Sequence, residues 1–217
     1  MARPRRTFRE RRPKPVWVIA CEDAVSAQAY FQALNRLFSS TVSLILAKQP
    51  GHKSSPAQVV ERAAGKFGDL SPSDHNDDRA WAVFDAEPQR GNEHKNTIDH
   101  AVALGRKMRV AVVVSNPCYE HWLRLHIGCC DGGFGSSREV VEALKCEWRR
   151  EFRSEYVKGR TDPSRLVTVE RLDAAVERAL AQHAQQDKKR AHRCRPCVTE
   201  LYQLVEELKK LDEAGPE

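Results

Sequence analysis

The sequence lacks any apolar run long enough to cross a bilayer. Its longest apolar runs are residues 16–21 and 108–114, whereas a membrane-spanning helix needs about 20 such residues. No apolar stretch follows the basic N-terminus, so no secretory signal is predicted. With 41% hydrophobic and 30% charged residues in 217, the chain is expected to be soluble, with one sizeable core and no membrane partner.

The cysteines also lack the regular spacing of a disulfide framework. Seven is an odd number, and a reducing cytoplasm is the predicted location. Cys194 and Cys197 form a CxxC pair, but no second pair has zinc-ligand spacing. The other donors that could complete a zinc site are scattered: His126, His192, Cys129 and Cys130. We therefore do not expect structural zinc, and we expect His126 and Cys118 to be packed side chains.

Outside its first 14 residues the chain has no net charge. Residues 1–14 carry seven basic side chains and one acidic one, which accounts for the whole excess of +6. We expect a flexible arm that binds a polyanion such as RNA or DNA through counterion release. A solvated tail that only aids solubility is an equally good reading. The arginines of this arm are Arg3, Arg5, Arg6, Arg9, Arg11 and Arg12.

Residues 15–128 alternate between strand and helix patterns. Strands are predicted at 16–21, 41–47, 81–84 and 108–114, and each is followed by a helical pattern. The second helix begins near Pro56 and is expected to end at Gly65 or Gly68, and the third spans 97–105. This alternation predicts an α/β fold in which helices cover a parallel sheet with right-handed crossovers.

Residues 129–217 change character and form helical stripes that are expected to pack on this core. A glycine- and cysteine-containing loop comes first. Apolar residues then recur at helical spacing in three groups: Val141, Leu144, Trp148 and Phe152; Leu172, Val176, Ala179, Leu180 and His183; and Val198, Leu201, Leu204, Val205 and Leu208.

Acids and polar residues follow three of the predicted strands. Glu22 follows the first, Asp85 and Glu87 the third, and Ser115 and Asn116 the fourth. Carboxyl ends of parallel strands lie along one edge, where open α/β sheets bind ligands, so these residues are expected to meet there. Residues i and i+2 of an extended chain share a face, which would aim Asp85 and Glu87 at one hard cation. The pair can also simply begin a solvated turn.

Three boxes in this order make the chain resemble the RloB family, which is linked to phage defence and has a Toprim-like core. The first two are Val18-Ile19-Ala20-Cys21-Glu22 with Tyr30-Phe31, and Val83-Phe84-Asp85-Ala86-Glu87. The third and most specific is Val114-Ser115-Asn116-Pro117-Cys118-Tyr119-Glu120-His121-Trp122. Weaker similarity continues at Tyr156-Val157-Lys158 and near the C-terminus, and the arginine-rich start also fits.

The resemblance implies a Mg²⁺- or Mn²⁺-dependent nuclease of a bacterial anti-phage system, with RNA, tRNA included, favoured over DNA. Asp85 and Glu87 would bind the metal, and Glu22 would be a ligand or a general acid/base. A regulatory protein of the same system is a further expected partner. The supporting residues would be Ser115 and Asn116 for substrate orientation, Glu120 near the ligands, and Lys158 for phosphate charge. Asn116-Pro117 can alternatively be only a turn, and Lys158 only a solvated lysine.

The chain departs from the family pattern at four positions. Asp23 replaces a usual glycine, Ser26-Ala27 replaces Thr-Glu, and Glu87 replaces Asp. Glutamate at 87 keeps the charge, but Ala27 removes a carboxylate that can serve a second metal. The alternative is therefore a catalytically degenerate Toprim-like module that binds nucleic acid or a partner protein. A nucleotide-signal sensor ranks last, because the sequence has no glycine-rich phosphate loop.

Overall fold

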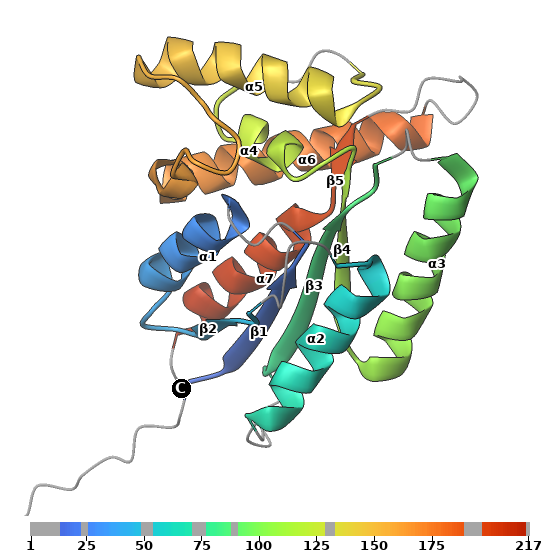
Figure 1. The fold of residues 1–217 in the computed structure, drawn as a ribbon. Helices are drawn as coiled ribbons and strands as arrows, with labels where there is room; N and C mark the ends of the chain where they lie inside the picture. Colours follow the sequence, from blue (N-terminus) through green and yellow to red (C-terminus); the bar gives the residue numbers. More distant parts are fainter. Residues whose placement is uncertain are drawn as a thin grey trace, which may run out of the picture.

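Five strands form one sheet in the order β2-β1-β3-β4-β5, with helices on both faces (Figure 1). The structure is a computed structural model that describes residues 14–22, 26–48, 54–70, 77–87, 91–128, 133–188 and 197–215. The strands are β1 (Val16–Cys21), β2 (Ser43–Leu46), β3 (Arg79–Asp85), β4 (Ala111–Asn116) and β5 (Val198–Thr199). The helices are α1 (Ser26–Leu37), α2 (Pro56–Asp69), α3 (Gly91–Met108), α4 (Glu120–Leu125), α5 (Ser137–Phe152), the 3-10 turn η2 (Pro163–Leu166), α6 (Val169–Lys188) and α7 (Leu201–Ala214).

The first four strands run parallel, as the alternation of patterns predicts. In β1 and β3 the apolar residues are buried on both faces of the sheet, which explains their nearly continuous apolar sequence. Cys21 pairs with Val83, and Asp85 pairs with Ser115, so β1 ends two residues before β3, and β3 and β4 end within one residue of each other. Only β5 is antiparallel, and it closes the sheet beside β4.

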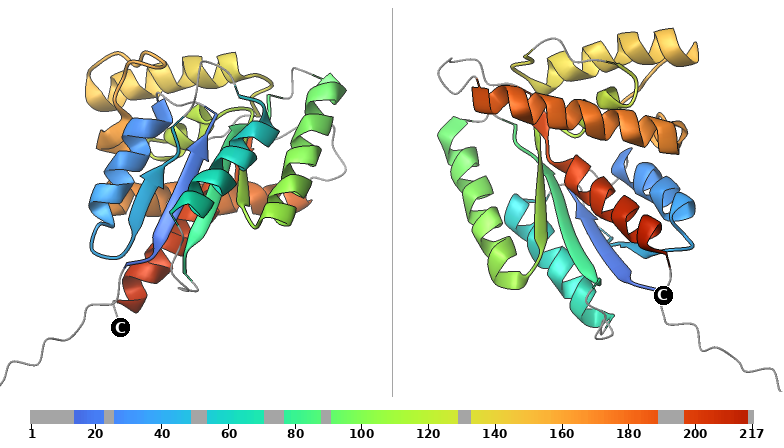
Figure 2. Two further views of the ribbon diagram at one scale, coloured as in Figure 1. Left: turned by 60° about the horizontal axis from the view of Figure 1, so that its bottom comes forward. Right: turned by 180° about the vertical axis from the view of Figure 1, so that it is seen from behind.

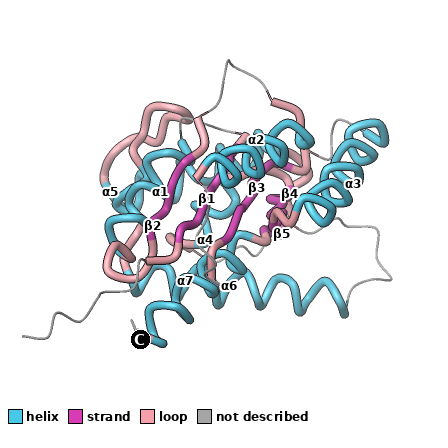
Figure 3. The backbone as a smooth tube through the Cα atoms, turned by 90° about the horizontal axis from the view of Figure 1, so that it is seen from below, coloured by secondary structure: helices cyan, strands magenta, loops and turns pink. Residues whose placement is uncertain are grey.

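Alternate residues of the four parallel strands contribute to two cores. Val18 and Ala20 pack with α2 and α3, whereas Trp17 and Ile19 pack with α1 and the C-terminal helices. The two helical layers on either side of the sheet are visible from below and from behind (Figures 2 and 3). Residues of α5, α6 and α7 share one continuous cluster with the sheet, so the last third of the chain packs on the same core as the first.

Several predicted boundaries are corrected. Gly65 and Gly68 lie inside α2, which continues to Asp69, and α3 begins at Gly91 and ends at Met108. Val198 belongs to β5 and not to a helical stripe. Leu180 of α6 is exposed. In the described part of the chain, no helix combines the length and the apolar character that crossing a membrane requires.

Candidate active site

The acids that end β1 and β3 are in contact at the carboxyl edge of the sheet. The Glu22 N–H continues the strand pairing by donating to Val83 O at 2.9 Å. The Glu22 side chain then turns back, and its Oε2 accepts the backbone N–H of Asp85 at 3.2 Å. The parallel register of β1 and β3 therefore brings together two carboxylates that lie 63 residues apart in the sequence.

Asp85 is a crowded, largely buried carboxylate. Its Oδ1 accepts the N–H of Tyr119, at 2.8 Å, from the segment just before α4. Burial raises the pKa of Asp85 well above its usual range, and repulsion from Glu120 and Glu22 raises it further, whereas Lys158 and the Tyr119 N–H oppose the rise. In the absence of a bound cation, this site therefore resists carrying its full negative charge.

Glu120 opens α4 and is completely buried. The ammonium of Lys158 lies 2.9 Å from its Oε1, and the thiol of the neighbouring Cys118 also interacts with this carboxylate. Burial of Lys158 lowers the pKa of its ammonium, but the Glu120 carboxylate outweighs it, so the net shift is upward. A lysine from the loop after α5 thus supplies positive charge to the acid edge.

The remaining predicted residues are placed less favourably for direct contact with a ligand. The Ser115 side chain is fully buried and its Oγ lies 2.8 Å from Thr199 Oγ1, which ties β4 to β5. Asn116 ends β4 beside Val198 and is partly buried. Glu87 is also partly buried, but β3 ends at Asp85 and Glu87 has a φ of 37°. The extended geometry that would align Asp85 with Glu87 therefore stops before Glu87.

The side chains at this edge could bind a divalent cation through a small number of protein oxygen atoms. Glu22, Asp85 and Glu120 offer hard oxygen donors, and the buried carboxylate of Glu120 already pairs with the ammonium of Lys158. Mg²⁺ is usually held by one or two carboxylates and keeps several waters. Among the described residues no three His, Cys, Asp or Glu side chains are arranged to hold a metal, so neither Glu87 nor Glu120 completes a ready three-ligand cluster with Glu22 and Asp85.

Arg62 is a neighbour that the sequence did not indicate. It lies on α2, donates to Cys21 O at 2.7 Å and to Ser54 Oγ at 2.8 Å, and so braces the residue before Glu22. Nothing in a single helical arginine marks this contact in the sequence. The arm arginines and the candidate zinc donors His192, Cys129, Cys130 and Cys194 lie outside the described residues. Both Cys118 and His126 are packed side chains, as predicted.

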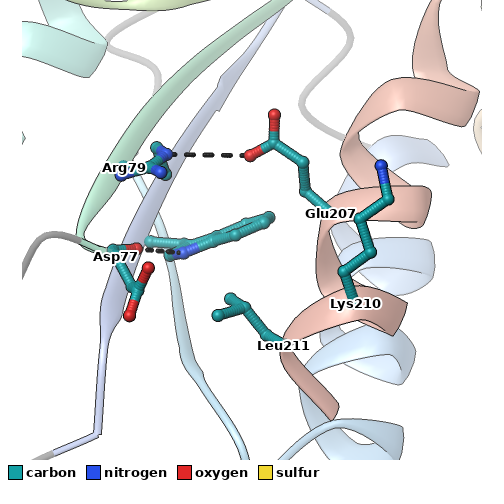
Figure 4. Close-up of a pocket in the computed structure, with 6 residues that line it drawn as sticks. Asp77, Arg79, Glu207, Lys210 and Leu211 are labelled. Carbon is teal, nitrogen blue, oxygen red and sulfur yellow. Dashed lines mark hydrogen bonds and ion pairs between the residues drawn. The ribbon is translucent and has the colours of Figure 1, made fainter. Parts of the chain in front are cut away.

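A surface hollow of about 200 Å³ lies away from these acids. It is lined by Trp17, Asp77 and Arg79 near the starts of β1 and β3, and by Glu207, Lys210 and Leu211 of α7 (Figure 4). The Trp17 indole donates to Asp77 O, and Arg79 pairs with Glu207 at 3.7 Å. The hollow lies at the opposite ends of the strands from Glu22 and Asp85.

The comparisons with known proteins agree with the three sequence boxes. A family model described as RloB-like protein matches residues 17–208, which include all of the acids at this edge. No curated protein and no solved structure matches the chain.

Proposed function

Because the chain belongs to the RloB-like protein family, we propose that it is a metal-dependent nuclease that cleaves phosphodiester bonds in a bacterial anti-phage defence system. RNA, with tRNA as one candidate, is favoured over DNA as the substrate. The observation that carries the proposal is the contact between the Glu22 carboxylate and the Asp85 N–H, since it joins the acids of two strands at the ligand-binding edge of the sheet.

The residues have separate tasks in this proposal. Asp85 and Glu22 hold the ion, and Glu22 moves a proton to or from the reacting oxygen. The bound ion supplies Lewis acidity to the phosphoryl group and lowers the pKa of a water molecule. Lys158, which reaches the same edge, offsets phosphate charge, and Asn116 at the end of β4 orients the substrate.

Ala27 favours a second candidate function. It lies in α1, is 1% exposed and packs in the core, so this position contributes no carboxylate to a second metal. A catalytically degenerate module would use the same edge and the basic arm to bind nucleic acid or a partner protein of the defence system.

The nuclease proposal is tested with purified full-length protein incubated with tRNA, other RNA and DNA in the presence of Mg²⁺ or Mn²⁺. Glu22→Gln and Asp85→Asn should each reduce cleavage by a factor of about 100 or more, because each removes a charge but keeps an oxygen for its backbone hydrogen bond. Glu142→Gln removes the same charge from an exposed ion pair on α5 and should leave cleavage unchanged.

Cleavage that persists in both edge variants would contradict the proposal. Calorimetry with Mg²⁺ separates the two candidates. If the protein is the nuclease, the wild type binds the ion and the Asp85→Asn variant does not. A protein that binds RNA but neither binds the ion nor cleaves would be the degenerate module.

A further inference from the structure

The charge balance at Glu120 depends on a single movable group. Its carboxylate is fully buried, and within the described residues the Lys158 ammonium is the cation paired with it. A buried carboxylate without a compensating charge is strongly unfavourable, because the protein interior replaces the water that would solvate it. Whatever moves Lys158 away from Glu120 must therefore leave another cation in its place.

The loop that carries Lys158 is anchored by its neighbours, and the lysine side chain is held through its pair with Glu120. Next to it, Tyr156 is buried, and its ring lies 5.4 Å from that of Trp148 on α5. The backbone N–H of Val157 donates to Thr161 Oγ1 at 2.7 Å. Lys158 itself is 47% exposed, so its side chain can leave Glu120 without moving the loop.

We propose that Lys158 occupies the place of a divalent cation on Glu120, and that a metal ion entering the acid edge exchanges with its ammonium. This inference rests on the proposed metal-dependent function and adds Glu120 to the residues that hold the ion. Without the ion, Lys158 neutralises the charge of Glu120 and keeps the carboxylate from binding another cation. Metal entry then frees the ammonium at the edge where a phosphate would bind.

The charges favour such an exchange once an ion is available. Three carboxylates, Glu22, Asp85 and Glu120, interact at this edge, and Lys158 brings one positive charge. A divalent ion brings two and accepts several oxygen ligands at once, which one ammonium group cannot do. The released lysine returns to water, where its charge is well solvated. Competition between the ion and Lys158 is the expected consequence.

Amine labelling of the wild-type protein measures this exchange directly. Acetylation of Lys158 by acetic anhydride, followed by mass spectrometry, should increase several-fold when saturating Mn²⁺ or Mg²⁺ is added at constant ionic strength. Lys145 is the matched control, because it also pairs with a glutamate, Glu142, but on the exposed surface of α5. Its labelling should not change. Equal or lower labelling of Lys158 in the metal-bound protein would overturn the inference.

Metal affinity provides an independent measurement by calorimetry with Mn²⁺. Lys158→Met should bind the ion at least tenfold more tightly than the wild type, because the competitor is gone, whereas Lys145→Met should match the wild type. If Lys158→Met fails to fold, the double variant Lys158→Met/Glu120→Gln removes both charges. It should fold and bind Mn²⁺ more weakly than the wild type, and undiminished binding would overturn the role of Glu120.

The outcomes distinguish this inference from the proposed function. Tight metal binding with no change at Lys158 rejects the exchange and leaves the nuclease standing. Binding that appears only in Lys158→Met also supports the exchange. In that case the wild-type pair of Lys158 with Glu120 is too stable for the ion to displace. Absence of binding in the wild type and in both folded variants rejects the exchange and the metal-dependent nuclease together.

Discussion

Tyr30 and His126 lie on segments far apart in the sequence, and their side chains meet inside the core. His126 Nδ1 lies 2.9 Å from Trp122 O, which can only accept, so Nδ1 carries the hydrogen. Its Nε2 therefore accepts from the Tyr30 hydroxyl at 3.1 Å, and that hydroxyl accepts from Trp122 Nε1 at 2.8 Å. Every polar atom in this buried network has a partner, which fixes α4, and with it Glu120, against α1.

The buried histidine makes stability depend on pH. Burial lowers the pKa of His126 to about 3 from an ordinary 6.5, although its bond to Trp122 O opposes the shift. Below pH 6.5 the unfolded chain takes up a proton that the folded protein refuses, so stability is lost as the pH falls toward the folded pKa. Between pH 7.5 and 5 this one group should remove about 2 kcal/mol from the free energy of unfolding.

Urea unfolding of the wild type and His126→Gln at both pH values measures this contribution. The variant should be less stable at pH 7.5 but should show a pH dependence smaller by about 2 kcal/mol. His100→Gln, on the exposed face of α3, should keep the wild-type dependence. If His126→Gln kept it as well, His126 would not be the group that titrates.

At the scale of elements, the packing of α3 against β4 depends on Gly105. A Cβ atom at this position would overlap Val112 Cγ2 and would lie 3.0 Å from Val110 O. Gly105→Ala should therefore lower the free energy of unfolding by about 1–3 kcal/mol despite the better helix propensity of alanine. Gly65, inside α2, has no atom within 4 Å of such a Cβ. Gly65→Ala should raise stability by up to about 1 kcal/mol.

Thermal and urea unfolding of Gly105→Ala and Gly65→Ala test both predictions. The same substitution is made at both positions, so the two changes in the free energy of unfolding can be compared directly. The opposite signs are the important result, because helix propensity alone predicts stabilisation at both positions. Stabilisation by Gly105→Ala would mean that α3 can move away from β4 at little cost.

The strands were predictable because burial on both faces leaves a sequence signature. The apolar runs of β1 and β3 identify strands directly, and the acids that follow them mark one edge by topology. Gly65 does not end α2, because Val59, Val60 and Ala63 are buried and their packing continues the helix past it. β5 was missed because two residues are too short to show any periodicity.

Only the site residues that lie at the ends of strands could be predicted from the sequence. Glu22 and Asp85 meet because their strands are neighbours, which the alternation of elements implies. The pairing of Glu120 with Lys158 depends on how the loop after α5 returns to α4, and no local pattern encodes that path. Likewise, the left-handed backbone of Glu87 follows from its hydrogen bond to Pro117 O and its surroundings, not from the Asp-x-Glu pattern.

At the scale of the whole molecule, the excess charge and the acid edge belong to opposite ends of β1. The basic arm, of which residues 1–13 lie outside the described residues, precedes Val16, whereas Glu22 follows Cys21 at the other end of the strand. Six residues of strand separate these points by about 20 Å. The arm is therefore attached at the end of β1 away from the acids, and it is expected to contribute affinity without taking part in the chemistry.

Deletion of residues 1–13 tests this division of labour. Removing six arginines should weaken RNA binding and reduce the slope of log affinity against log salt by up to about 4, at about 0.7 for each phosphate contact with a single strand. Fluorescence anisotropy over a KCl series measures that slope. A variant with all six arginines changed to lysine keeps the charge and should keep the slope. Cleavage at saturating RNA should be unchanged by the deletion, so that KM rises and kcat does not. A fall in kcat at saturation would place the arm in the reaction itself, and an unchanged slope would make it a solvated tail.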